Sequence, residues 1–343
     1  MERKEQFLTA MLQQLSPPRG GKNKRIKLSC WAKEWLEGVR LRVKESSYVK
    51  YCNLLQNHIL PELGEWTADQ LTTGAIERFV QQKLEHGRKD GTGGLSEKTV
   101  KDILNTLKEV CLYAANWDLE IPCHFEQIKI RRRDGEVRIL TRQKQLELAQ
   151  FLVSDNSLTK LGILLSLYMG LRLGEVCALQ RGCISYHEGV LSVRSTMQRI
   201  QNLKEEEPKR KKKTRIIITE PKSSSSVRDI PIPPFLLKRL EPLKDLPENA
   251  YVLTGSESRF IEPRTLENIL KRYLQECELE GVNYHVLRHT FATRCIEDGF
   301  DVKSLSEILG HASVNITLNR YVHSSLEQKR KHMEKVGEEI RRS

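Results

Sequence analysis

Five side chains in the second half of the sequence have the types needed for chemistry at a phosphodiester. They are one candidate nucleophile and four cationic or proton-donating groups: Tyr321, Arg172, His285, Arg288 and His311. Displacement at phosphorus places negative charge on the nonbridging oxygens, and the planar guanidinium of arginine binds two such oxygens at once. The set could therefore displace an alkoxide from a phosphodiester and leave the phosphate on the tyrosine.

The spacing of the histidines and arginines predicts how helices present them. His285 and Arg288 are three residues apart, which places both on one helical face. We expect His289 to project at a different angle and to be structural. Arg172 follows Gly170 and opens a helical pattern, where the free N–H groups of the first turn favour anions.

Near the C-terminus, Gly310 is placed to end a helix and to expose His311, and Tyr321 follows ten residues later. Taken singly, these residues have plainer explanations, such as a surface arginine at a helix start or a tyrosine in the core. The complete set favours a catalytic interpretation. A phenol has a pKa of about 10, so Tyr321 becomes a good nucleophile only when another group accepts its proton.

The leaving deoxyribose oxygen needs a proton, and Lys222 is the candidate acid. It lies in a Ser-rich turn between strand patterns at 215–219 and 227–232, where a β-hairpin tip would carry its ammonium group to bound DNA. The plainer interpretation of the local sequence is a solvated turn lysine, and a histidine could supply the proton instead.

Composition limits the class of partner and the compartment. The 343-residue chain has a formal net charge of +12, which favours a polyanionic partner because clustered Lys and Arg displace counterions from phosphates. Its eight cysteines show no Cys-x-x-Cys pair and no zinc-like grouping with histidine, so we expect no metal and reduced thiols. Neither a signal core nor a run of ~20 apolar residues is present. We expect a cytoplasmic protein that is nucleoid-associated when bound to DNA.

Changes in composition divide the chain into four segments. Residues 1–27 end in a Pro/Gly/basic run typical of a flexible arm, and residues 28–127 carry apolar stripes typical of four or five helices. One of these stripes should halt at Leu60-Pro61. Residues 128–139 form a candidate linker, and residues 140–343 a second domain.

The candidate linker carries five basic residues, three of them consecutive: Arg131, Arg132 and Arg133. A solvated charged strand and a DNA contact fit this composition equally well.

The second domain starts helical, carries three strand patterns and becomes helical again. The strand patterns lie at 189–193, 215–219 and 227–232, and the later helical patterns at 235–240, 266–277, 286–296 and 305–309. This order predicts an α+β fold with helices around a small antiparallel sheet.

Two further segments have candidate roles. Residues 204–215 separate strand patterns and include Lys211, Lys212 and Lys213, which fit either a solvated loop or an extended hairpin against the DNA backbone. Residues 324–343 have a thin apolar stripe with Ser325 as a candidate helix cap. So thin a stripe can hardly hold a helix in isolation, so we expect it to dock on another surface, such as its own domain.

Several motifs, in this order, resemble the tyrosine recombinase (phage integrase) family. They are Gly170-Leu-Arg-Leu-Gly-Glu175, Pro221-Lys-Ser with Val227-Arg-Asp-Ile-Pro-Ile232, His285-Val-Leu-Arg-His-Thr-Phe-Ala-Thr293, Leu309-Gly-His311 and Thr317-Leu-Asn-Arg-Tyr-Val-His323. The agreement extends through residues 140–325, and residues 28–127 resemble the family's helical core-binding domain more loosely. The chain looks most similar to integrases of conjugative transposons and Gram-positive prophages.

The resemblance implies a site-specific recombinase that needs no cofactor, because a covalent 3′-phosphotyrosine preserves the ester bond energy. It implies a C-shaped clamp around double-stranded DNA, with residues 128–139 following the duplex, and a homotetramer on two DNA sites. In such a tetramer the helix of residues 324–343 would dock on a neighbouring protomer, as the alternative to its own domain. An excisionase or a host DNA-bending protein would be a further partner. By resemblance, six residues fill the catalytic positions: Arg172, Lys222, His285, Arg288, His311 and Tyr321.

One departure concerns the N-terminus. Integrases of this kind commonly carry an arm-binding domain of some tens of residues, whereas about 27 residues precede the helical domain here. We expect either that arm sites are dispensed with or that the domain is shortened.

Two alternatives remain open at the level of sequence. A type IB topoisomerase has related chemistry but only relaxes supercoils, and the separate helical domain with the Leu-Gly-His motif favours the recombinase. A non-catalytic architectural DNA-binding protein would have no use for the nucleophile Tyr321.

Overall fold

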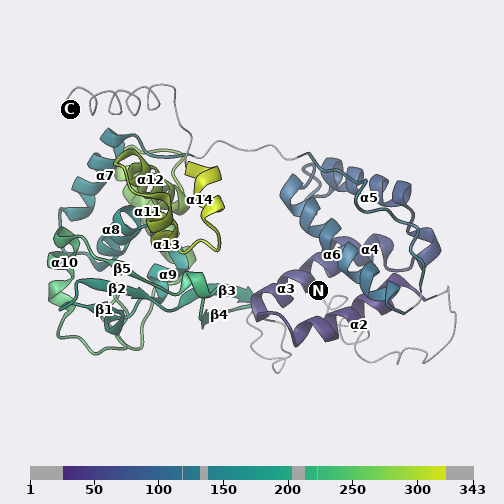
Figure 1. The fold of residues 1–343 in the computed structure, drawn as a ribbon, viewed down its shortest axis with the longest axis horizontal. Coiled ribbons are helices and arrows are strands. Elements are labelled where there is room, and N and C mark those ends of the chain that lie inside the picture. Colours follow the sequence, from purple (N-terminus) through teal and green to yellow (C-terminus); the bar gives the residue numbers. More distant parts are fainter. Residues whose placement is uncertain (1–25, 118, 132–137, 203–212, 222, 322–343) are drawn as a thin grey trace, which may run out of the picture. The chain divides into compact units, whose positions relative to one another are not determined.

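The computed structural model describes residues 26–117, 119–131, 138–202, 213–221 and 223–321. The chain divides into two compact units, Met1–Gly135 and Glu136–Ser343, hereafter the helical unit and the α+β unit (Figure 1). Of the helices in these described ranges, none has the length and apolar character of a membrane span. All eight cysteines are free thiols, and four of them are buried.

The helical unit is built from four longer helices around one apolar core. Their bounds are α2 Leu28–Arg40, α3 Glu45–Leu54, α5 Thr73–His86 and α6 Glu97–Ala115. The expected start of α6 is confirmed, since the Ser96 hydroxyl accepts a hydrogen bond from the backbone N–H of Thr99. The two tryptophans of α2 are buried against α6 and its neighbours.

The expected halt at Leu60-Pro61 is wrong. The chain continues from α3 through a π-helical turn, Leu55–Ile59, into α4, Leu60–Leu63. In this turn the N–H of Leu60 donates to the carbonyl of Leu55, five residues back. The wider turn accommodates the proline, which lacks an N–H and crowds the carbonyl four residues before it.

The α+β unit has eight α-helices and five short strands in its described residues. The helices are α7 Arg142–Val153, α8 Leu158–Met169, α9 Leu173–Ala178, α10 Pro234–Leu240, α11 Pro263–Glu276, α12 Tyr284–Glu297, α13 Val302–Leu309 and α14 Val314–Tyr321. The strands are β1 Ile184–Ser185, β2 Val190–Val193, β3 Thr196–Gln201, β4 Thr214–Thr219 and β5 Arg228–Pro231. The predicted α+β class is confirmed.

The strands form two antiparallel sheets rather than one. Their orders are β1-β2-β5 and β3-β4. β3 was not predicted because its buried residues, Met197 and Ile200, are three positions apart. That spacing breaks the alternation of apolar and polar residues typical of a strand. β3 and β4 are antiparallel partners on either side of residues 202–213. The solvated loop and the extended hairpin both stay predictions for that basic segment, because residues 203–212 lie outside the described ranges.

The expected hairpin tip around Lys222 is wrong. β4 pairs with β3 while β5 pairs with β2, so the flanking strands belong to different sheets. A 3₁₀ turn, Ser224–Ser226, precedes β5. Lys222 itself lies outside the described residues.

Helix α8 is the centre of the α+β unit. Most of its residues are buried, and it packs against α12, where the Ser166 and Tyr284 hydroxyls are 2.7 Å apart. It ends at Gly170, whose φ of +66° lies in the left-handed region that favours glycine. A Cβ atom at Gly170 would lie 2.6 Å from the Phe291 ring and 3.0 Å from Leu309. The glycine therefore lets α8, α12 and the end of α13 meet closely.

We predict that Gly170→Ala destabilises the α+β unit by at least ~1 kcal/mol more than Gly299→Ala. Both substitutions carry the cost of a left-handed backbone, but Gly299, with φ of +88°, has no atom within 4 Å of an added Cβ. Calorimetry of the full chain measures both. All four tryptophans lie in the helical unit, so its fluorescence-monitored unfolding is an internal reference that should not change. Equal destabilisation by the two variants would contradict close packing at Gly170.

Candidate active site

Arg172 stands at the N-cap of α9 and is held by two partners. Its Nη1 donates to Glu175 Oε1 at 2.7 Å, and its Nη2 donates to the carbonyl of Gly310 at 3.0 Å. Its backbone N–H also donates to Glu175 Oε2 at 2.9 Å. The side chain is 35% exposed. The guanidinium is therefore held by hydrogen bonds on one side and open to solvent on the other.

Glu175 is a buried carboxylate between two arginines. Besides Arg172, it accepts hydrogen bonds from Arg228 Nη1 at 3.0 Å and Nη2 at 2.9 Å. Its side chain is 3% exposed and that of Arg228 is 5% exposed. Burial raises the carboxyl pKa, but the hydrogen bonds and charge of Arg228, together with Arg172, outweigh burial and leave the pKa at about 2. Glu175 is therefore ionised throughout the neutral range.

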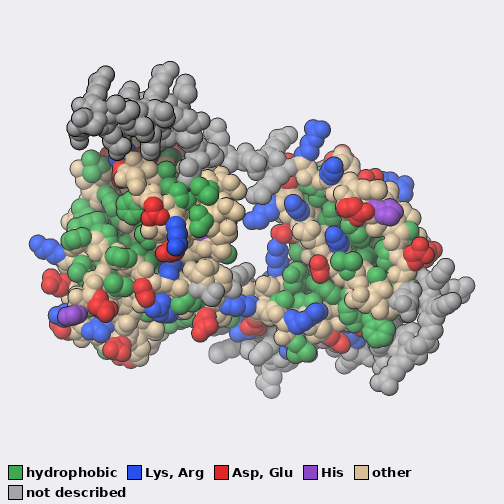
Figure 2. Space-filling model, viewed as in Figure 1, with side chains coloured by type: hydrophobic (Ala, Val, Ile, Leu, Met, Phe, Trp, Pro, Cys, Tyr) green, Lys and Arg blue, Asp and Glu red, His purple; other side chains and the backbone are tan. Residues whose placement is uncertain are grey.

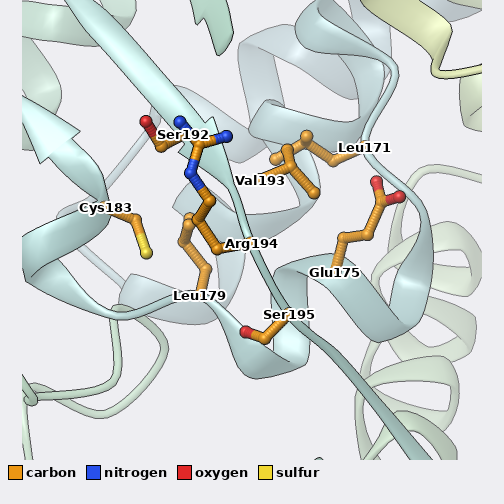
Figure 3. Close-up of a pocket in the computed structure, with 8 residues that line it drawn as sticks. All are labelled: Leu171, Glu175, Leu179, Cys183, Ser192, Val193, Arg194 and Ser195. Carbon is orange, nitrogen blue, oxygen red and sulfur yellow. The ribbon is translucent and has the colours of Figure 1, made fainter. Parts of the chain in front are cut away.

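A small hollow lies beside this carboxylate. Leu171 and Glu175 face residues 192–195, the end of β2 and the two residues after it, and the Arg194 guanidinium points away from Glu175 (Figure 3). Its volume is about 10 Å³. That is room for about one water molecule, so a phosphodiester would have to bind on the open side of Arg172 instead.

Arg288 reaches the same region from α12. It is 2% exposed, and its Nη1 donates to the carbonyl of Gly170 at 2.6 Å while Nη2 donates to that of Leu309 at 2.5 Å. Burial, and next the charge of Arg172, lower the pKa of this guanidinium. The arginine caps the carbonyl ends of α8 and α13 together, which satisfies groups that helices leave unpaired.

Tyr321 is the last described residue, at the end of α14. It is 6% exposed, and its Oη lies 2.7 Å from Nδ1 of His289. The His311 ring lies parallel to the tyrosine ring at a centroid distance of 6.5 Å. Burial raises the phenol pKa, and the charges of Arg288, Arg320 and Arg172 oppose that rise.

His285 and His311 flank this pair. The His285 ring contacts the His289 ring edge-on, with centroids 4.3 Å apart, and His285 is exposed. His311 Nδ1 lies 2.8 Å from the Thr317 hydroxyl. Desolvation, followed by the charge of Arg288, lowers the pKa of both rings to about 4. Both are neutral at pH 7 and can each donate one N–H.

The expectation that His289 projects at a different angle is wrong, because its ring contacts that of His285 and hydrogen-bonds Tyr321. At 3.6 residues per turn, a residue four positions on is rotated by about 40°, which is less than the roughly 60° of a residue three positions on. His289 therefore shares the face of His285 more closely than Arg288 does. The spacing itself was the signal that could have found it.

The structure thus brings five of the six predicted catalytic residues into one connected cluster: Arg172, His285, Arg288, His311 and Tyr321. The sixth, Lys222, is outside the described residues, as are Arg132, Arg133, Lys211 and Lys212. Arg131 and Lys213 are described and exposed, the first in the helical unit and the second directly before β4.

Sequence reasoning missed the roles of Glu175 and Arg228. Each is a charged residue at a buried position, Glu175 inside α9 and Arg228 at the start of β5. A charge at a core position indicates a buried partner, but the sequence alone does not say that these two residues are that pair.

Comparisons with known proteins agree along most of the chain. Residues 138–328 match the model described as the phage integrase family, and residues 27–84 match the phage integrase N-terminal SAM-like domain. The XerC-like tyrosine recombinase of Caldanaerobacter subterraneus subsp. tengcongensis is 27% identical over 89% of this chain and 81% of its own length. The prophage phiRv2 integrase of Mycobacterium tuberculosis is 25% identical over 86% of this chain and 74% of its own.

The fold has solved counterparts that were determined with DNA. The Tn1549 transposon integrase in complex with a circular intermediate DNA has a TM-score of 0.68 at 20% identity, covering 89% of this chain and 99% of that one. A lambda integrase dimer bound to a core site has a TM-score of 0.63 at 16% identity, covering 86% of this chain and 95% of that one.

We predict an acid-labile contribution to stability from Glu175. Its pKa is about 2 in the folded chain against an ordinary value of 4.5. A depressed carboxyl pKa stabilises the fold fully above pH 4.5, and this contribution of about 3 kcal/mol is lost as the pH falls toward 2. Glu175→Gln should unfold more easily at pH 7 and lose little further stability over that range.

Calorimetry of the full chain between pH 7 and pH 3 measures this effect, with the exposed Glu280→Gln as the matched control. If Glu175→Gln and the unaltered chain lose stability in parallel as the pH falls, the buried carboxylate is not held by the arginines.

Proposed function

The chain belongs to the phage integrase family, whose members cleave and rejoin DNA, and we propose that Tyr321 is the nucleophile with which it does so. The observation that carries the proposal is the buried hydrogen bond of the Tyr321 hydroxyl beside Arg288 and Arg172. A tyrosine in a purely structural role gains nothing from cations that favour its phenolate.

Arg172 and Arg288 stabilise the charge that develops on the nonbridging oxygens. Their guanidiniums are already oriented by the carbonyls of Gly310, Gly170 and Leu309, so little reorganisation is needed when the phosphate arrives. His285 and His311, as neutral rings, each donate an N–H to the same group.

The reaction is an exchange of one phosphate ester for another. The Tyr321 oxygen bonds to the scissile phosphorus, the bond from phosphorus to the 5′ oxygen breaks, and Lys222 gives that oxygen a proton. The product is a 3′-phosphotyrosine and a free 5′ hydroxyl. Rejoining runs the same steps in reverse with a 5′ hydroxyl as the nucleophile, so no cofactor is consumed.

The two units share the DNA in this proposal. Residues 28–127 bind one face of the duplex and residues 140–343 carry the active site on another, with residues 128–139 following the backbone and residues 1–27 as a basic arm. The net charge of +12 supports this. On the face of the helical unit in Figure 2, Lys and Arg side chains lie exposed among acidic ones. The DNA contacts include Arg131, Arg132, Arg133, Lys211, Lys212 and Lys213.

Strand exchange requires four copies of this chain on two DNA sites, and residues 324–343 would link one copy to the next. The biological task we propose is integration and excision of a mobile element or prophage. Similarity to the phiRv2 prophage integrase and a fold shared with the Tn1549 transposon integrase support it. An excisionase or a host DNA-bending protein would set the direction.

We predict that Tyr321→Phe abolishes the covalent protein–DNA adduct and leaves DNA affinity nearly unchanged, because one hydroxyl is a small part of a phosphate-dominated interface. A nicked duplex spanning a sequenced element junction, run on a denaturing gel, measures the adduct. A mobility-shift titration measures affinity. A comparable loss of binding would show that Tyr321 is structural, and relaxation without exchange between duplexes would indicate a topoisomerase.

We predict that Lys222→Ala slows cleavage of the ordinary nicked duplex by a hundredfold or more, the usual size of a lost general acid. A substrate with sulfur at the bridging 5′ position should restore most of the rate, since a thiolate leaves without a proton. Single-turnover cleavage of both substrates measures this rescue. If sulfur gives no rescue, the acid is another residue, with His311 the next candidate.

A further inference from the structure

The hydroxyl of the proposed nucleophile, Tyr321, has one neighbouring group among the residues that this structure describes that can accept its proton. Tyr321 Oη lies 2.7 Å from Nδ1 of His289, and both residues are buried. His311 uses its own Nδ1 for the Thr317 hydroxyl. Within the described part of the chain, no hydrogen bond joins the side chain of His285 to Tyr321. The nearest basic nitrogen to the nucleophile therefore belongs to His289, which directly follows Arg288.

We propose that His289 accepts the phenolic proton of Tyr321 as the phenol attacks the scissile phosphodiester. This assignment rests on the proposed function of Tyr321. His289 touches the reacting oxygen and is then a catalytic residue, while His285 serves the phosphate.

The hydrogen bond fixes the tautomer that this role requires. For Nδ1 to accept from the phenol, the neutral ring must carry its proton on Nε2. As the bond from oxygen to phosphorus forms, the proton passes to Nδ1 and the ring becomes an imidazolium. The 5′ oxygen leaves with a proton from the general acid. In rejoining, the imidazolium returns the proton to the phenolate that departs from phosphorus.

The charges around His289 keep its ring neutral, and so able to accept a proton, before the substrate binds. Desolvation, followed by His285, Arg320, Arg288 and His311, lowers the pKa of His289 to about 3. These groups come from α12 itself, from α14 and from the turn after α13. Without DNA the ring is a neutral acceptor across the physiological range. A phosphodiester placed among the same cations offsets their charge and favours the imidazolium.

A purely structural interpretation is testable, because a buried tyrosine hydroxyl needs some hydrogen-bond partner in any case. His289→Asn places an amide oxygen or nitrogen where Nδ1 lies, so the variant keeps a partner but cannot take a proton. His289→Ala removes both functions. The exposed His187→Asn is the matched control in the same unit.

The first measurement is nitrogen NMR of the full chain with ¹⁵N-labelled histidine. We expect the resonance that disappears in His289→Asn to be a neutral ring protonated at Nε2, with an Nδ1 shift that changes in Tyr321→Phe. A ring protonated at Nδ1, or a shift that Tyr321→Phe leaves unchanged, overturns the proposal without involving DNA.

The second measurement is the pH dependence of single-turnover cleavage of a nicked duplex spanning a sequenced element junction. His289→Asn should cleave about a hundredfold more slowly than the unaltered chain. Its rate should rise about tenfold per pH unit on the alkaline side, because the phenol then ionises unaided. DNA affinity should stay the same, and His187→Asn should match the unaltered chain.

The outcomes separate this proposal from the one on which it rests. If the unaltered chain forms an adduct and His289→Asn shows the same pH profile, with or without a uniform loss of rate, proton transfer to His289 is wrong while Tyr321 remains the nucleophile. If the unaltered chain forms no adduct, the proposed function fails and this assignment fails with it.

Discussion

Helices α8 and α13 end within reach of a single guanidinium, and the rest of the site depends on how their last carbonyl groups are bound. Arg288 donates to the carbonyls of Gly170 and Leu309, Arg172 donates to Gly310, and Arg228 donates to that of Ile308. The terminal carbonyls of a helix carry partial negative charge, so they attract cations and hold them in place. Two left-handed glycines make the approach possible. Three arginines still repel one another, and the ionised Glu175 between Arg172 and Arg228 offsets that repulsion.

This arrangement explains the protonation states of the surrounding groups. Burial, and next the positive charges of the surrounding groups, lower the pKa of His285, His289 and His311, so these rings are neutral near pH 7. A phosphodiester supplies the negative charge that the cluster lacks. The bound phosphodiester would therefore pair with the arginines and, by offsetting their charge, ease proton transfer to an imidazole. In the absence of DNA, burial keeps the Tyr321 hydroxyl protonated, because it raises the phenol pKa against the opposing charges of Arg288, Arg320 and Arg172.

Much of this site was predictable from the sequence, because its residues lie at helix ends that glycines mark. Gly310 indicated the end of α13, Arg172 after Gly170 indicated the start of α9, and the spacing of His285 and Arg288 indicated a shared face. Two kinds of feature could not be predicted. The pairing of Glu175 with Arg228 joins residues 53 positions apart in sequence through tertiary structure alone. The separation of β4 and β5 into two sheets depends on β3, whose apolar residues do not alternate. His289 was missed through a misjudged angle, although its position on the helix was fixed by the spacing.

The most direct test of the account is to find which atom carries the DNA after cleavage. The adduct formed by the full chain on a nicked duplex is digested with nuclease and trypsin, and the peptides are sequenced by mass spectrometry. Cleavage after Arg320 makes Tyr321 the first residue of its peptide. We expect a nucleotide joined through phosphate to the Tyr321 oxygen. A nucleotide on any other residue would contradict the assignment of Tyr321 as the nucleophile.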